Sequence, residues 1–97
     1  MTRLPVIRSL LANEDMLSIW AYVALDNVSA ADKLLRRFDE KFELLSLSPE
    51  LGERVPNLGK DYRRVIVGNY LIFYQVLDDA VRVIRVLHAA RRWEDLL

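Results

Sequence analysis

The sequence predicts a two-layer α+β domain in which a helical hairpin packs on one face of a mainly antiparallel four-stranded sheet. Two segments between residues 13 and 48 repeat apolar side chains with the helical period. Three segments rich in β-branched and aromatic residues follow between residues 62 and 87. A short apolar segment at residues 4–9 precedes the helices. The resulting order of strand, helix, helix and three strands is typical of this class of domain.

The length and composition indicate one globular domain, residues 1–97, with a single hydrophobic core. Hydrophobic residues make up 53% of the chain and charged residues 29%, which excludes a disordered tail. The absence of cysteine excludes a disulfide framework and a thiolate metal site. No segment approaches the roughly 20 apolar residues of a membrane span, and residues 1–8 do not resemble a secretory signal, so we expect a cytoplasmic protein.

The net charge is zero, but the charges are unevenly distributed along the chain. Residues 1–53 hold 6 Lys and Arg against 9 Asp and Glu, and residues 54–97 hold 8 against 5. A neutral chain is not a general nucleic-acid coat. Its basic second half can still steer one face toward an acidic partner, although ordinary charge scatter explains the same numbers.

The first strand and the first helix are predicted from residues 4 to 27. Val6 and Ile7 favour a strand, and Pro5 suits the edge of a sheet because it cannot donate a hydrogen bond. This strand can pair beside either the last or the first of the later strands. Asn13 is the expected N-cap of the first helix. The helical period is carried by Met16, Ile19, Trp20 and Val23.

The second helix is expected to begin at Ser29 and to end at Ser48-Pro49. Only two or three residues connect the helices, which requires an antiparallel hairpin. Gly52, Pro56 and Gly59 predict a loop over residues 50–60. One apolar stripe runs along the helix through Ala31, Leu34, Leu35, Phe38, Phe42 and Leu45.

The three predicted strands span residues 62–67, 70–77 and 81–87. The dipeptide Gly68-Asn69 favours a tight hairpin between the first two of them. Strict alternation along the last strand puts Arg82 and Arg85 on opposite faces of the sheet. An edge strand is expected to remain open in this arrangement.

Six segments, taken in this order, resemble the ParE/RelE superfamily of bacterial toxin–antitoxin toxins. They are residues 16–22, 29–32, 47–54, 62–64, 68–74 and 83–91, and together they cover nearly the whole chain. The strand Tyr-Leu-Ile-Phe-Tyr and the ending Val-Leu-His-x-x-Arg look more like ParE toxins than like RelE ribonucleases.

The resemblance implies a toxin that poisons DNA gyrase by binding it and is neutralised by a ParD-like antitoxin. Such a toxin needs no catalytic residues and is not an enzyme. The exposed sheet face and the C-terminal tail would contact gyrase through Arg64, His88, Arg91, Arg92 and Trp93. The antitoxin would lie on the helical hairpin and contact Trp20, Leu35, Phe38 and Phe42, which are core residues in the alternative interpretation.

Two other functions remain open from the residues. A RelE-like ribosome-dependent ribonuclease needs a general base, here Glu53 or His88, and cations on the phosphate. Related ribonucleases usually supply an additional aromatic or basic group near the C-terminus, often a tyrosine after the histidine region. Here Ala89 and Ala90 follow His88, which disfavours catalysis. The third candidate is a non-toxic module that only binds antitoxin. The cations available for a phosphate are Arg54, Arg64 and Arg91.

His88 also has a purely structural interpretation, because a residue at the end of a strand often hydrogen-bonds a neighbouring backbone group. A lone histidine without a second ligand does not form a metal site. We therefore expect no metal ion and no cofactor.

Overall fold

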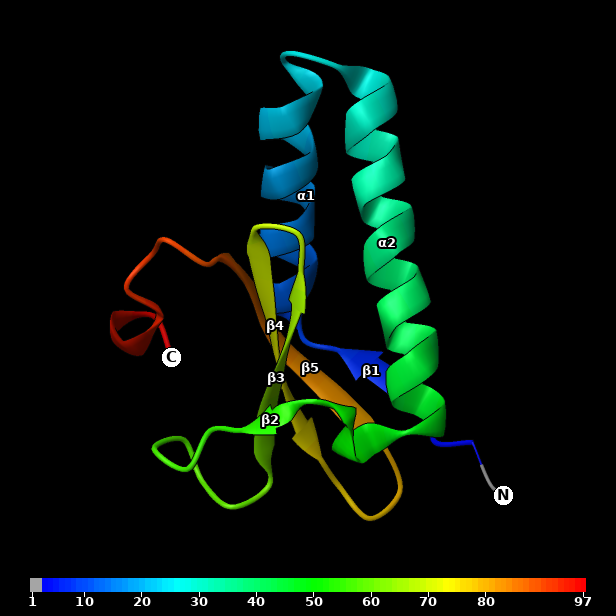
Figure 1. Cartoon of the computed structure of the whole chain (residues 1–97), viewed down its shortest axis with the longest axis vertical. Coiled ribbons are helices and arrows are strands. Elements are labelled where there is room, and N and C mark those ends of the chain that lie inside the picture. The colour runs from blue at the N-terminus through cyan, green and yellow to red at the C-terminus, as the bar shows by residue number, and fades with distance from the viewer. Residues whose placement is uncertain (1–2) are drawn as a thin grey trace.

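The computed structural model describes residues 3–97. The predicted domain began at residue 1, and its first two residues lie outside the described residues. Two helices cover one face of a five-stranded sheet, which confirms the predicted α+β class (Figure 1). The elements are β1 Val6–Arg8, α1 Leu10–Ala24, α2 Val28–Leu47, η1 Pro49–Leu51, β2 Glu53–Arg54, β3 Tyr62–Val67, β4 Tyr70–Val76, β5 Val81–His88 and η2 Trp93–Asp95. No helix within residues 3–97 is long and apolar enough to cross a bilayer.

The sheet has the order β1-β5-β4-β3-β2, one strand more than predicted. The additional strand, β2, falls in the segment expected to be a loop, and its two residues pair with Arg63 and Arg64 of β3. The first strand lies parallel to the last, with Val6 opposite Val81, which settles the pairing that the sequence left open. A strand of two residues carries no periodicity, so sequence reasoning had no signal for β2.

Both helices begin earlier than predicted. Ser9, rather than Asn13, caps α1, and its hydroxyl accepts a hydrogen bond from the Ala12 amide at 3.0 Å. Asn27, rather than Ser29, caps α2 through the Ala30 amide at 3.0 Å. The apolar period did not locate the caps, because each first turn buries only one small residue, Ala12 or Ala31, while the larger side chains there are exposed. The helical hairpin projects beyond the turn that joins β3 and β4 (Figure 1).

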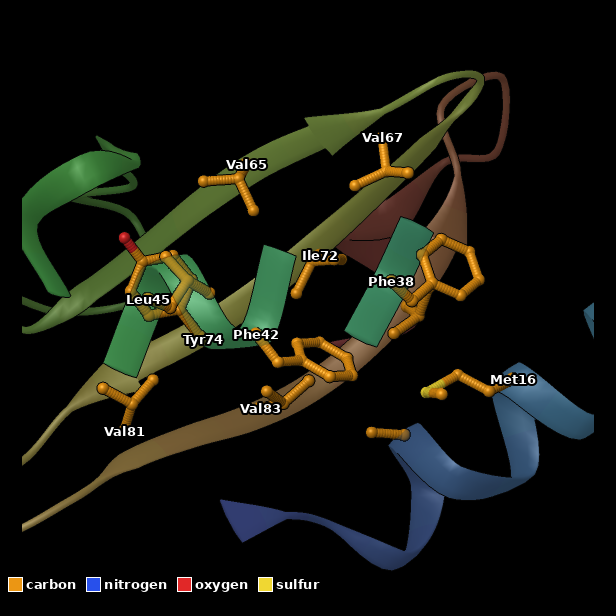
Figure 2. Packing of buried hydrophobic residues seen from close by; sticks show 12 residues of the cluster. Met16, Phe38, Phe42, Leu45, Val65, Val67, Ile72, Tyr74, Val81 and Val83 are labelled. Carbon is orange, nitrogen blue, oxygen red and sulfur yellow. The ribbon is translucent and has the colours of Figure 1, made fainter. Parts of the chain in front are cut away.

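The main core lies between the helices and the sheet (Figure 2). Phe38 and Leu45 of α2 are fully buried against Ile72 and Tyr74 of β4. Phe38 and Phe42 were expected to contact an antitoxin, but their exposed fractions are 0% and 6%. They belong to the core, because the stripe that carries them is the face of α2 turned toward the sheet.

A second apolar cluster lies on the outer face of the sheet, which is the face opposite the helices. Its buried members are Val55, Leu71, Phe73 and Leu87, with Leu58, Trp93 and Leu96 packed against them. This outer face was expected to be exposed. The loop after β2 and the C-terminal tail cover it instead, because β4 and β5 carry apolar residues on both faces.

A β-bulge interrupts the pairing of β4 with β5. Phe73 lies opposite Arg85 and Tyr74 opposite Val83, which leaves Ile84 as the extra residue. Val83 and Val86 therefore share the main core although they are three positions apart. The strict alternation assumed from the sequence is wrong beyond Ile84, since one inserted residue moves every later side chain to the other face.

Tyr74 fastens the segment between α2 and β2 to the sheet. Its hydroxyl donates to the Pro49 carbonyl at 2.7 Å and accepts from the Gly52 amide at 2.8 Å. Burial raises the pKa of the Tyr74 phenol. The position of Gly52 requires glycine, since a Cβ there would lie 2.5 Å from the Arg64 carbonyl and 2.6 Å from the Tyr74 hydroxyl.

Replacing Tyr74 by phenylalanine is expected to lower the free energy of unfolding by about 2 kcal/mol, because the buried Pro49 carbonyl and Gly52 amide lose their partner. Urea unfolding followed by circular dichroism measures the change. Tyr22→Phe is the matched control, since Tyr22 is 74% exposed and should tolerate the loss of its hydroxyl. Equal stability of the two variants would contradict this anchoring role.

Candidate functional site

The structure divides the five predicted target contacts between the two faces of the sheet. His88 lies opposite Tyr70 on the helix face, and Arg64 lies opposite Phe73 on the outer face. Residues that pair directly across strands point to the same side. The C-terminal tail, residues 89–97, then passes from the end of β5 to the outer face, where Trp93 packs. A single flat target surface therefore cannot contact all five residues.

Trp93 anchors the tail on the outer face. Its ring lies 5.0 Å from the Phe73 ring, tilted by 37°. The Arg64 guanidinium carbon lies 5.7 Å from the centre of the Trp93 ring, and Arg64 Nε donates to Glu53 Oε1. This arrangement makes Trp93 and Arg64 partners of each other. The predicted contact role of Trp93 is thereby restricted to the part of the indole that remains exposed.

Arg91 and Arg92 are exposed on the tail. Arg92 Nε lies 3.5 Å from Asp95 Oδ2 in a solvent-exposed pair, and such pairs contribute little to stability. Within residues 3–97 Arg91 forms no ion pair. Both guanidinium groups are therefore available to a partner, while Trp93 fixes the neighbouring backbone to the sheet.

His88 has the structural role considered from the sequence. Its Nδ1 accepts a hydrogen bond from the Ala90 amide at 3.0 Å, which shapes the start of the tail. The ring also packs edge-on against Tyr70, with 5.3 Å between ring centres.

An ion pair that the sequence did not reveal holds α1, β5 and the tail together. Asp15 accepts from Arg85 Nε at 2.7 Å, from Arg85 Nη2 at 2.8 Å and from the Val86 amide at 3.0 Å. Arg85 Nη1 donates to the Leu96 carbonyl at 3.0 Å. The hydrogen bonds to Asp15 raise the pKa of Arg85. Both side chains are 13% exposed.

Asp15 and Ser9 also hydrogen-bond backbone groups of β5 that no neighbouring strand pairs with. β1 ends opposite Val83, so the backbone of β5 beyond that point has no neighbour on this side. The Ser9 hydroxyl donates to the Ile84 carbonyl at 2.7 Å, and Asp15 accepts from the Val86 amide. These side chains supply hydrogen-bond partners to backbone groups at the edge of the sheet, which could otherwise pair with another chain. The partners are about 70 residues apart in sequence, and no local pattern links them.

The remaining predicted antitoxin contacts, Trp20 and Leu35, lie half-buried on the hairpin. They line a groove of about 430 Å³ between α1 and α2, which we call the hairpin groove. Trp20 Nε1 donates to Asp32 Oδ1 at 2.9 Å and so links the two helices. The other residues that line the hairpin groove are Asn13, Met16 and Leu17.

The arrangement of a helical hairpin on this sheet also occurs in solved structures from toxin–antitoxin systems. A chain of the chromosomal ParDE toxin–antitoxin system from P. aeruginosa superimposes with a TM-score of 0.71 at 17% identity, over 89% of this chain and 96% of that chain. A chain of the RelBE2 toxin–antitoxin complex from Mycobacterium tuberculosis superimposes with a TM-score of 0.64 at 20% identity, over 94% and 97%. At such low identity these likenesses establish the fold alone.

Sequence comparison identifies the family within this fold. The profile described as the ParE toxin of the type II toxin–antitoxin system parDE matches residues 6–93. Toxin ParE1 of Caulobacter vibrioides is 33% identical over 78 residues, which are 79% of this chain and 80% of that protein. The chain belongs to the ParE toxin family of type II toxin–antitoxin systems.

Proposed function

We propose that this chain is a cytoplasmic toxin that inhibits DNA gyrase by binding it and that a ParD-like antitoxin neutralises it. Membership of the ParE family supports the class of activity. The observation that carries the proposal is the anchored tail, in which Trp93 packs on Phe73 while Arg91 and Arg92 remain exposed. A tail whose backbone is already held on the sheet by Trp93 loses little backbone entropy on binding, which favours recognition of an acidic protein surface by its two cations.

The separation of the candidate catalytic groups supports binding rather than catalysis. Glu53 lies in register with Phe73 on the outer face, whereas His88 lies in register with Tyr70 on the helix face. Three positions along the strands correspond to about 10 Å, and three strand spacings add about 14 Å across the sheet. Glu53 and His88 at that separation cannot act together on one phosphodiester bond, which leaves each without a second proton-transfer group from the other.

The hairpin groove supports an antitoxin site. Leu17 is 69% exposed and lines the groove together with Trp20. The related structures described above come from ParDE and RelBE2 systems, in which toxin and antitoxin occur together. We propose that an apolar helix of the antitoxin lies in this groove, with Trp20 and Leu35 as contacts.

A gyrase supercoiling and DNA-cleavage assay tests the proposed target. The purified chain should block supercoiling and accumulate cleaved DNA, whereas a variant with Arg91→Glu and Arg92→Glu should inhibit at least about tenfold less, as expected for loss of charge-assisted contacts. Normal supercoiling at saturating toxin would reject the proposal for the gyrase tested. Ribosome-dependent messenger-RNA cleavage would then be measured, with Glu53→Gln as the variant that separates cleavage from binding. Antitoxin binding without growth arrest would identify a non-toxic module.

A further inference from the structure

A second groove lies on the opposite side of α1 from the hairpin groove. We call it the tail groove, because the first residues of the tail form one of its walls. Its volume is about 610 Å³. The lining residues are Asp15, Ser18, Ile19, Tyr22, Asn69, Tyr70, Val86, Leu87, His88 and Arg91.

The two grooves share α1 but use different faces of it. The hairpin groove takes positions 13, 16, 17 and 20, and the tail groove takes positions 15, 18, 19 and 22. The second set is the first set shifted by two residues, which corresponds to roughly 200° around a helix. A partner that covers the hairpin groove therefore reaches the tail groove by crossing the exposed surface of α1.

The tail groove combines an apolar floor with a polar rim. Ile19 contributes aliphatic surface above the almost fully buried Val86, and the rim carries the phenols of Tyr22 and Tyr70. Burial raises the pKa of Tyr70, and the nearby Tyr22 adds to the shift. The Tyr70 phenol therefore remains a protonated donor at neutral pH. Such a surface suits a short aliphatic side chain flanked by an acceptor.

The charge of the tail groove selects an acidic ligand. Asp15 is the one acid among its lining residues, and its charge is matched by the two hydrogen bonds from Arg85. Within residues 3–97 Arg91 has no ion-pair partner, so it leaves one uncompensated positive charge at the rim. A single cation matches one carboxylate, whereas a nucleic-acid strand requires several cations along its phosphates.

We infer that the tail groove binds an extended peptide segment of a protein partner, with an Asp or Glu side chain on Arg91 and an adjacent aliphatic side chain over Ile19. The identity of that partner as the antitoxin rests on the proposed function. An occupant of this groove covers His88 and Arg91, which are proposed target contacts. Neutralisation would then follow from direct masking of part of the gyrase-binding surface.

Titration of the ¹⁵N-labelled chain with acetyl-Leu-Glu-Leu-amide tests the groove without gyrase. The peptide should shift the backbone amide signals of Asn69, His88 and Arg91. Acetyl-Leu-Gln-Leu-amide should bind about tenfold more weakly, since it lacks the charge that Arg91 pairs with. Arg91→Gln should remove this preference, and Arg92→Gln is the matched control, because Arg92 does not line the groove.

Equal binding of the Glu and Gln peptides, or shifts confined to other surfaces, would overturn the inference. Tighter binding of adenosine monophosphate than of the Glu peptide would also overturn it and would indicate a nucleotide phosphate as the ligand. Peptide binding by a chain that leaves gyrase active would uphold the groove and reject only the gyrase proposal. If a complex with a ParD-like antitoxin still bound the peptide with undiminished affinity, the antitoxin would be excluded as the occupant.

Discussion

Replacing Asp15 by alanine is expected to lower the free energy of unfolding by about 3 kcal/mol. The substitution leaves the Arg85 guanidinium, 13% exposed, without its carboxylate. It also leaves the Val86 amide without an acceptor at the end of the sheet where β1 has stopped. A buried cation that loses its partner keeps its desolvation cost, and this cost dominates the loss. Urea unfolding followed by tryptophan fluorescence measures the effect.

Glu43→Ala is the matched control for this ion pair. Arg3 Nη1 lies 2.7 Å from Glu43 Oε2, as close as the Asp15 pair, but the two side chains are 55% and 64% exposed. Solvent screens that pair, so its loss should cost less than about 1 kcal/mol. Equal losses for the two variants would show that burial does not determine the strength of the Asp15–Arg85 pair. Asp15→Asn should fall between them, because it keeps an acceptor oxygen and loses the charge.

Removal of residues 91–97 is expected both to abolish growth arrest and to lower the free energy of unfolding by about 3 kcal/mol. In the structure, Trp93 and Leu96 pack on the outer face of the sheet, where Phe73 is fully buried. The truncation also removes the Leu96 carbonyl that accepts from Arg85. Thermal unfolding of the truncated chain measures the loss.

A truncated chain that loses activity therefore does not identify contact residues, and point variants must separate the two roles. Arg91→Glu together with Arg92→Glu should change the free energy of unfolding by less than about 0.5 kcal/mol, since both side chains are exposed. The same variant should fail to arrest growth. Trp93→Phe should keep the packing on Phe73 and most of the toxicity. Growth arrest by the double charge variant would reject the tail as the target contact.

The local sequence pattern determined the helical hairpin, the three long strands and the family. The stripe that contains Phe38 and Phe42 has the helical period, and its physical cause is the burial of one face. The hairpin of β3 and β4 follows from Gly68, whose φ of +57° is easily reached only by glycine. Each of these signals depends on neighbours within a few residues, so it can be read before any tertiary contact is known.

Only the tertiary structure decided which side chains are available to a partner. The bulge at Ile84 reverses the facing of the later residues of β5, and a single inserted residue leaves no periodic signal. Only the tertiary fold places Arg85, 70 positions later in the chain, against Asp15. Trp93 appeared to be an exposed contact until Phe73 and Arg64 were found beneath it. The burial of these groups is set by segments distant in the chain, and for that reason the sequence alone did not predict it.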